Sequence, residues 1–136
     1  MPKVTRNGDM FAAVDPSTGE TIGALTMDAD GYMNLAVYTK AAQSELRGNQ
    51  VLSALREAAE REGVSIRGMR GLWYDGDNLA SFNKAILAGA PPEKAAFQTF
   101  TGKMANGYGY PNVRIDYTRS VRNPDGTFAK AELWFD

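Results

Sequence analysis

The chain has 136 residues, with 15 Lys and Arg against 16 Asp and Glu, so its formal net charge is -1. It contains neither cysteine nor histidine. This composition excludes disulfides, thiol nucleophiles, zinc sites built from Cys and His, and catalysis by a histidine base. We therefore expect no metal site. The balanced charge argues against a nucleic-acid partner, although a local basic patch stays open.

The length suits one domain over residues 1–136, and no linker, repeat or low-complexity stretch divides it. No apolar run reaches the ~20 residues needed to cross a bilayer, so we expect no membrane partner. No charged-then-apolar signal segment opens the sequence as given. We expect a soluble protein in the cytoplasm of a producing or target cell, although the sequence can also be a fragment of a larger toxin.

The first elements are short strands. Two mostly apolar segments, 10–15 and 20–26, flank the turn sequence PSTG and predict a β-hairpin. A second turn at 28–31 leads into 32–39, where apolar residues alternate and both faces are partly apolar, as in a central strand. The three strands predict an antiparallel meander.

The clearest element is a helix over 49–62. Glu57 and Arg61 form a favourable i,i+4 pair on its polar side, and Gly63 is placed to end it as a C-cap. Its apolar stripe consists of Val51, Leu52, Leu55, Ala58 and Ala59.

The second half continues the alternation of strands and helices. In chain order we expect a strand over 65–74, a helix in 75–89, a helix in 91–110, and strands over 112–122 and 128–135 joined by the turn NPDG. A right-handed β-α-β connection predicts that strands 32–39 and 65–74 are parallel neighbours. The sequence thus predicts an α+β fold, a mostly antiparallel sheet with packed helices.

This order of elements resembles the GNAT acetyltransferase superfamily over roughly residues 10–135. NLAVYT resembles the strand before the family's cofactor loop, and LRGNQVLSAL resembles that loop with its helix. GLWYDGDN resembles the next strand with its trailing asparagine, and KMANGYGYPNVRI the helix that ends in Gly-aromatic. The resemblance implies a GNAT-like domain and an acyl-coenzyme A cofactor, whose pyrophosphate binds backbone N–H groups at the helix start.

The resemblance also implies roles for particular residues. The pyrophosphate would be held by Arg47, Gly48, Asn49, Gln50 and Val51. The backbone from Leu35 to Val37 would align the pantetheine arm, and Asn78 would add a cofactor contact. The catalytic candidates are Asp75 and Asp77, either of which could act as a base directly or through water, and Lys103.

A second resemblance covers residues 71–110. A Trp, a Gly-Asp-Asn, a Phe-Asn, a Pro-Glu-x-Ala-Ala and a Thr-x-Thr-Gly-Lys follow one another in this segment. The same order resembles C-terminal domains of bacterial polymorphic toxins and phage-associated proteins. It implies a toxin or effector and carries no catalytic assignment of its own.

Several positions differ from the GNAT pattern. Gln50 and Leu52 stand where the family has later glycines, and Ala105 stands where it often has an acid tyrosine. The family's first strand and first two helices have no counterpart. The resemblance implies a GNAT-like acyltransferase that acts on a host protein or small acceptor. These differences favour an alternative. In it the chain is a catalytically inactive GNAT-like binding protein, a phage inhibitor or structural module, that acts on a host protein. Whether the chain is an enzyme is left open.

Two motifs have a second interpretation. LRGNQ either is an anion site or only begins a helix with Asn49 as its cap; Gln50 decides, since Leu52 continues the apolar stripe in both cases. Thr101 to Lys103 resembles the end of a phosphate loop, but Thr and Gly in a helix also indicate a break.

Two polar groups are equally open. The carboxylates and amide after the strand 65–74 could form a site or cap the next helix. Arg114, Arg119 and Arg122 could form a basic strip or a solvated sheet face.

Overall fold

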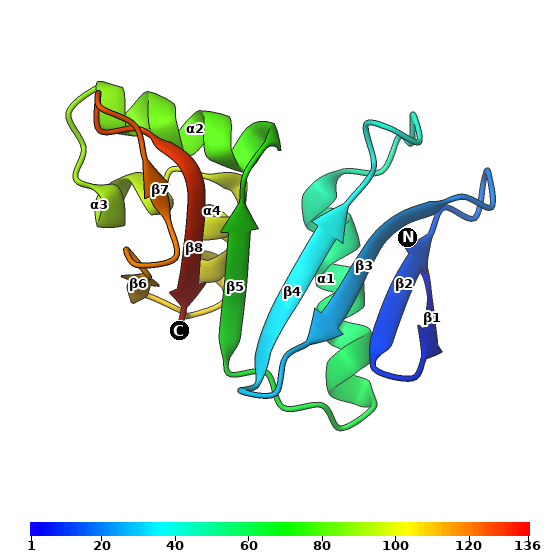
Figure 1. The fold of residues 1–136 in the computed structure, drawn as a ribbon. Coiled ribbons are helices and arrows are strands. Elements are labelled where there is room, and N and C mark those ends of the chain that lie inside the picture. Colours follow the sequence, from blue (N-terminus) through cyan, green and yellow to red (C-terminus); the bar gives the residue numbers. More distant parts are fainter. The chain divides into compact units, whose positions relative to one another are not determined.

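The computed structural model describes residues 1–136 and divides into two compact units, Met1–Arg67 and Gly68–Asp136. Helices α1 to α4 and strands β1 to β8 make it an α+β protein, which confirms the predicted class (Figure 1). None of the helices is long and apolar enough to cross a membrane. The expectations of a single domain and of parallel pairing between 32–39 and 65–74 stay predictions, because each unit is described by itself.

The first unit is an antiparallel meander with one helix. Its strands are β1 (Lys3–Asn7), β2 (Met10–Val14), β3 (Thr21–Met27) and β4 (Tyr32–Val37), in that spatial order, and its helix is α1 (Gly48–Arg61). The predicted meander and helix are therefore confirmed. The additional strand, β1, has the polar sequence KVTRN, which carries no strong alternation of apolar residues.

Helix α1 packs on one face of this sheet through its apolar stripe. Val51, Leu52 and Leu55 are fully buried. The contact is close at Gly23 on β3, where an added Cβ atom would lie 2.5 Å from Cγ1 of Val51. The absence of a side chain at Gly23 thus allows the helix to approach the sheet.

The predicted end of α1 is also confirmed. Gly63 has a φ of +79°. Its N–H donates to the carbonyl of Glu60 at 3.0 Å, and the N–H of Val64 donates to the carbonyl of Ala59 at 3.0 Å. This pair of hydrogen bonds is a Schellman motif, which satisfies two carbonyls that the helix leaves without partners.

The second unit contains an antiparallel sheet in the order β5-β8-β6. Its strands are β5 (Gly68–Trp73), β6 (Val113–Ile115), β7 (Val121–Arg122) and β8 (Phe128–Phe135). Both β6 and β7 pair with β8. The predicted pairing of 112–122 with 128–135 is thus confirmed, but the prediction of one continuous first strand is wrong.

Asp116 interrupts that strand. Its Oδ1 accepts the N–H groups of Thr118 at 3.0 Å and Arg119 at 3.2 Å, and the hydroxyl of Thr118 at 2.6 Å. These local bonds give the backbone an alternative to the sheet ladder. The chain therefore turns between β6 and β7.

The helices of this unit are α2 (Gly76–Leu87), α3 (Pro92–Ala96) and α4 (Phe100–Gly107). The prediction of one helix in 91–110 is wrong, and the broken-helix interpretation of its Thr and Gly residues is confirmed. Thr99 Oγ1 accepts the N–H of Gly102 at 2.9 Å as the N-cap of α4, and donates to the carbonyl of Ala96 at 2.7 Å. A Cβ on Gly102 would lie 2.0 Å from that carbonyl oxygen. The break therefore requires both residue types.

Aromatic side chains form the core between these helices and one face of the sheet. Ring centroids lie 5.5 Å apart for Trp73 and Phe82, and 5.3 Å apart for Phe97 and Phe135. Because side chains alternate along β5 and β8, Arg70 and Trp134 project from the opposite face.

Replacing Gly102 with Ala should lower the free energy of unfolding by about 1–3 kcal/mol, because the new methyl group meets the backbone of Ala96. Gly107→Ala is the matched control in the same helix, since nothing lies within 4 Å of its Cβ position. It should be neutral or stabilising by up to about 1 kcal/mol. Urea unfolding measures both, and equal effects would contradict the close approach.

Candidate functional site

The loop between β4 and α1 leads to the predicted cofactor site. It contains two turns, in which the N–H of Ala42 donates to the carbonyl of Tyr38 and that of Ser44 to the carbonyl of Thr39, each at 2.9 Å. Gln43, at φ +53°, is the one residue other than glycine with a left-handed backbone. The loop is thus folded on itself before it reaches Arg47.

A buried carboxylate fixes this loop to the end of β2. Ser44 Oγ donates to Oδ2 of Asp15 at 2.6 Å and accepts the N–H of Leu46 at 3.1 Å. Asp15 is only 4% exposed, and its Oδ1 accepts the N–H of Ser17 at 2.8 Å. The hydrogen bond from Ser44 is the main cause that holds the pKa of Asp15 below its usual value, and the bond from the Ser17 N–H is the second.

The sequence analysis missed this pair. Asp15, Pro16 and Ser17 gave a turn signal, and the structure does contain the turn. Ser44 lies 29 residues further along and belongs to no motif. No local pattern indicated that the two side chains meet.

The first turn of α1 uses part of its own hydrogen-bonding capacity. Arg47 precedes the helix with an extended backbone, and its N–H donates to Oε1 of Gln50 at 2.8 Å. The N–H of Gln50 donates to Oδ1 of Asn49 at 3.0 Å, and the N–H of Val51 donates to the carbonyl of Arg47 at 3.1 Å. Gln50 therefore folds back over the helix start, as expected for a simple helix beginning.

Two further groups remain available at the same place. The N–H groups of Gly48 and Asn49 have no acceptor within the chain. They stand at the positive end of a 14-residue helix, and the exposed Arg47 lies directly before them. Leu52 is fully buried, as predicted. At the start of α1, the Gln50 side chain thus accepts the N–H of Arg47, while the N–H groups of Gly48 and Asn49 are free.

The predicted pantetheine-aligning residues lie on β4. Because the N–H of Tyr38 donates to the carbonyl of Ile22 at 2.8 Å, alternate residues of β4 direct their backbone groups to β3. Leu35 and Val37 fall between them. Their N–H and C=O groups therefore point to the edge of β4 away from β3.

In the second unit, Asn78 has a structural partner. Its Nδ2 donates to Oγ1 of Thr101 at 2.9 Å, and its Oδ1 accepts the N–H of Thr101 at 3.1 Å. The amide thereby joins α2 to α4. Its oxygen and one hydrogen are occupied by the fold rather than free for a cofactor.

The three catalytic candidates are all exposed. Asp75 is the residue before α2, Asp77 lies in the first turn of α2, and Lys103 lies on α4. Thr99, which shares the sequence neighbourhood of Lys103, is fully buried in the cap described above. Thr99 and Lys103 therefore form no common polar site.

Tyr117 is another titratable group of this unit. Its hydroxyl donates to Oε1 of Glu93 at 2.6 Å. Burial first, and next this hydrogen bond, raise the pKa of Tyr117 to about 12. At neutral pH the side chain is a hydrogen-bond donor and not a base.

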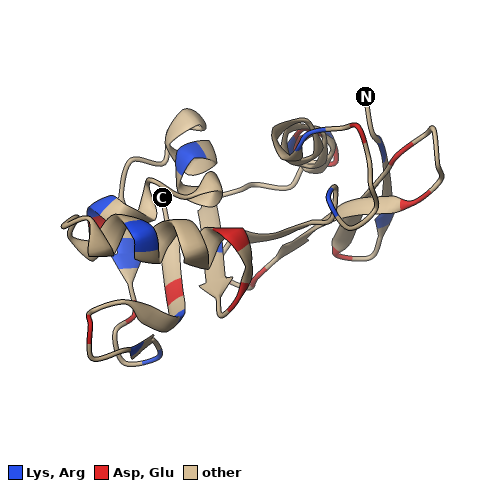
Figure 2. Cartoon of the chain, turned by 90° about the horizontal axis from the view of Figure 1, so that it is seen from above, with Lys and Arg blue, Asp and Glu red and all other residues tan.

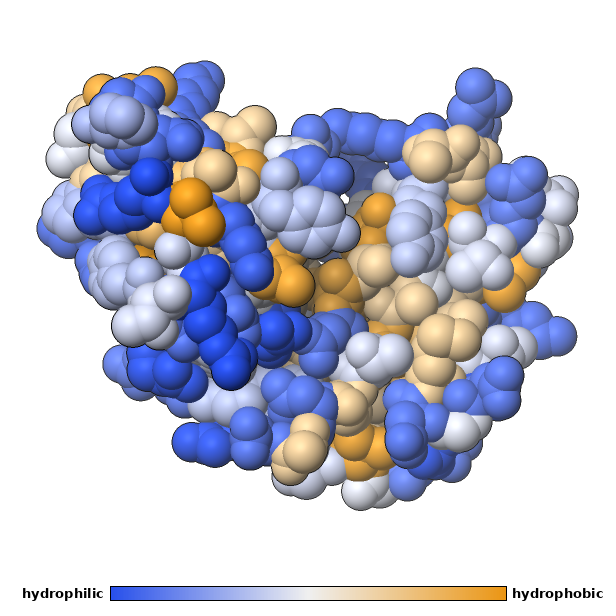
Figure 3. Space-filling view, in the orientation of Figure 1, coloured by the Kyte–Doolittle hydropathy of each residue, from blue (hydrophilic) through white to orange (hydrophobic).

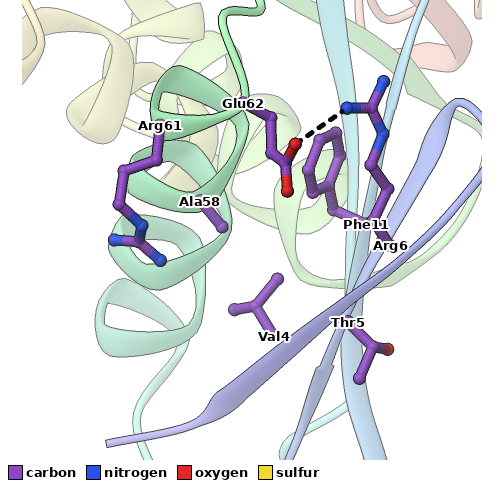
Figure 4. A pocket seen from close by; sticks show the side chains of 7 residues that line it. All are labelled: Val4, Thr5, Arg6, Phe11, Ala58, Arg61 and Glu62. Carbon is purple, nitrogen blue, oxygen red and sulfur yellow. Dashed lines mark hydrogen bonds and ion pairs between the residues drawn. The ribbon is translucent and has the colours of Figure 1, made fainter.

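A small hollow lies at the other end of α1 from Arg47. It has a volume of about 100 Å³ and is lined by Val4, Thr5, Arg6, Phe11, Ala58, Arg61 and Glu62 (Figure 4). Nη1 of Arg6 lies 3.3 Å from Oε2 of Glu62, while Arg61 points away from this ion pair. The hollow is therefore separate from the predicted cofactor site.

Charges of both signs are interspersed over each unit (Figure 2). The three arginines of the predicted strip have different partners. Arg114 lies over the ring of Trp134, Arg119 contacts Glu132, and Arg122 lies over Phe128 and donates to the carbonyl of Gly126. Each arginine is thus held by contacts of its own, and the three do not form one continuous strip.

Comparisons with protein-family models, curated proteins and solved structures found no match. The resemblances to GNAT acetyltransferases and to toxin domains therefore stay hypotheses.

The Asp15 carboxylate should contribute to the pH dependence of stability. Its folded-state pKa is lowered, so its contribution is present above the unfolded pKa and is lost as pH falls through the folded pKa. Stability should therefore decrease from about pH 4 downward. Asp15→Asn keeps an amide oxygen that can accept the Ser17 N–H, replaces the acceptor of the Ser44 hydroxyl with an NH2 group, and has no carboxyl group to titrate, so it should flatten this decrease.

Urea unfolding between neutral and acidic pH measures the effect. Asp9→Asn is the matched control, because Asp9 is exposed. Parallel curves for the native chain and Asp15→Asn would contradict the role of Asp15.

Proposed function

We propose that the chain is a GNAT-like acyltransferase domain of the toxin or effector kind, which binds an acyl-coenzyme A at the start of α1. The observation that carries this proposal is the pair of free N–H groups of Gly48 and Asn49 beside Arg47. Consecutive free donors at a helix N-terminus suit a diphosphate, because they point along the positive end of the helix dipole. The Arg47 guanidinium would add charge from the loop side.

The geometry around these donors supports the same proposal. The Asp15–Ser44 bond fixes the preceding loop, so the donors need little ordering when a ligand binds. Gly48 has no side chain to occupy the space of a phosphate. The backbone groups of Leu35 and Val37, which point away from β3, are suited to pair with the amides of a pantetheine arm.

The acyl transfer needs a base near the acceptor. Asp75 or Asp77 would take the proton of an attacking amine or hydroxyl, directly or through water. The acceptor oxygen or nitrogen would form a bond to the thioester carbonyl carbon, and the carbon–sulfur bond would then break. Coenzyme A would leave as a thiolate and become a thiol by taking the proton that the carboxylate had accepted. Lys103 would contribute positive charge. The acceptor would be a host protein or a small molecule.

A second candidate function is a binding protein that has lost the cofactor. Specific observations favour it: Gln50 caps the helix start, and the Asn78 amide is occupied by Thr101. Ala105, which stands where the family often has a tyrosine, is fully buried. Such a protein would act on a host protein through its surface alone.

Titration with acetyl-coenzyme A tests the leading proposal. Binding should give measurable heat below about 1 mM ligand and should shift the amide NMR signals of Gly48 and Asn49. Arg47→Ala should weaken binding, whereas Arg61→Ala, at the other end of α1, should not. No heat at millimolar ligand would end the proposal.

Gln50→Gly separates the two candidate functions. The change removes the side chain that folds over the first turn, so affinity for coenzyme A should rise if this side chain narrows a real site. The cost to the helix should be about 1 kcal/mol in unfolding free energy. Lower stability in urea with no gain in affinity would support the binding protein instead.

A further inference from the structure

The sheet of the second unit has one face that the helices leave open. Across this face, Arg70 on β5 and Arg114 on β6 are both register partners of Trp134 on β8. The two guanidinium carbons lie 5.8 Å and 4.2 Å from the centroid of the Trp134 ring. We call this surface the Arg–Trp face.

A buried carboxylate organises the cations of the Arg–Trp face. Glu132 is 4% exposed, and its Oε1 lies 2.8 Å from Nη2 of Arg70 and 3.5 Å from Nη1 of Arg119. The hydrogen bond from Arg70 holds the pKa of Glu132 below its usual value, against the effect of burial. The negative charge thus lies inside the surface, while the arginines reach outward.

The charges that reach solvent are mostly positive. Arg114 is exposed and lies over the Trp134 ring, and no carboxylate pairs with it. The side chain of Arg119 is 66% exposed, and its Nε lies 4.0 Å from Oδ2 of Asp116. Lys130 lies two residues before Glu132 on β8, so it shares this face and adds a further cation.

Apolar side chains lie among these cations. Leu72 is the register partner of Glu132, and Val121 is the register partner of Lys130. They are 40% and 53% exposed. In the space-filling view, strongly hydrophilic side chains over β5 and β8 surround isolated hydrophobic ones (Figure 3).

We propose that the Arg–Trp face docks an acidic, partly apolar segment of a partner protein. Carboxylates of the segment would pair with Arg114 and Arg119, and its apolar side chains would cover Leu72 and Val121. The opposite charges of the two surfaces specify the partner's chemistry. Stacking on Trp134 restricts the Arg114 guanidinium before binding, so less side-chain entropy is lost when it pairs.

The same geometry argues against a nucleic acid on this face. A base would have to stack on an exposed ring, but Arg114 already lies over the Trp134 ring. Tryptophan and arginine are, by contrast, the residues that most often dominate the energy of protein–protein contacts.

The test uses a short synthetic peptide in which glutamates are interspersed with leucines, and an analogue with glutamine in place of every glutamate. The chain has two tryptophans, so each indole N–H gives its own NMR signal. The acidic peptide should shift the signal of half-buried Trp134 and leave that of buried Trp73 in place. The glutamine analogue should bind much more weakly.

Arg114→Ala and Arg119→Ala should each lower the affinity for the acidic peptide about fivefold. Lys84→Ala is the control with the same change of charge on an exposed position of α2, and should leave affinity unchanged. An unchanged Trp73 signal shows that each variant is folded. Equal binding of the two peptides, equal loss in Lys84→Ala, or no binding at about 1 mM peptide would overturn the proposal. Tighter binding of an oligothymidylate would overturn it in favour of nucleic acid.

Discussion

The packing of α1 against β3 is the contact on which the first unit depends. Val51 fits over Gly23, where any side chain would collide with it, and Leu55 lies beside the same position. Since interiors are close-packed, this contact sets both the distance and the position of the helix on the sheet. The place of the Arg47–Asn49 donors relative to the β4 backbone follows from it. The chemistry proposed for the helix start therefore rests on a glycine that touches no ligand.

In the second unit, several polar residues that resemble site residues in the sequence instead stabilise the fold. Thr99 caps α4, the Asn78 amide joins α2 to α4, and Asp116 turns the chain between β6 and β7. Each forms hydrogen bonds with backbone groups that would lack a partner where a helix or strand is interrupted. Polar residues in a suggestive order are thus weak evidence of catalysis until their partners are known.

Periodicity predicted the elements whose burial follows a regular pattern. The stripe of α1 is of this kind and is buried. The strand β4 is also found, but its residues are buried or half-buried without alternation, as its two partly apolar faces indicated. The break in 91–110 was only one of two interpretations, because it depends on the backbone of Ala96 reaching Gly102. In the candidate site, the donors beside Arg47 follow from a local motif. The Asp15–Ser44 bond does not, since it joins residues that only the folded sheet brings together.

That bond also links two segments thermodynamically. The loop before α1 cannot open without taking the Ser44 hydroxyl from a buried, ionised Asp15, which is costly. Order in the β2–β3 turn and order at the helix start are therefore coupled. Coupling of this kind is reciprocal. An anion bound to Gly48 and Asn49 would therefore protect the amides of the β2–β3 turn from hydrogen exchange. Conversely, a less ordered turn would lower the affinity for the anion by the same factor.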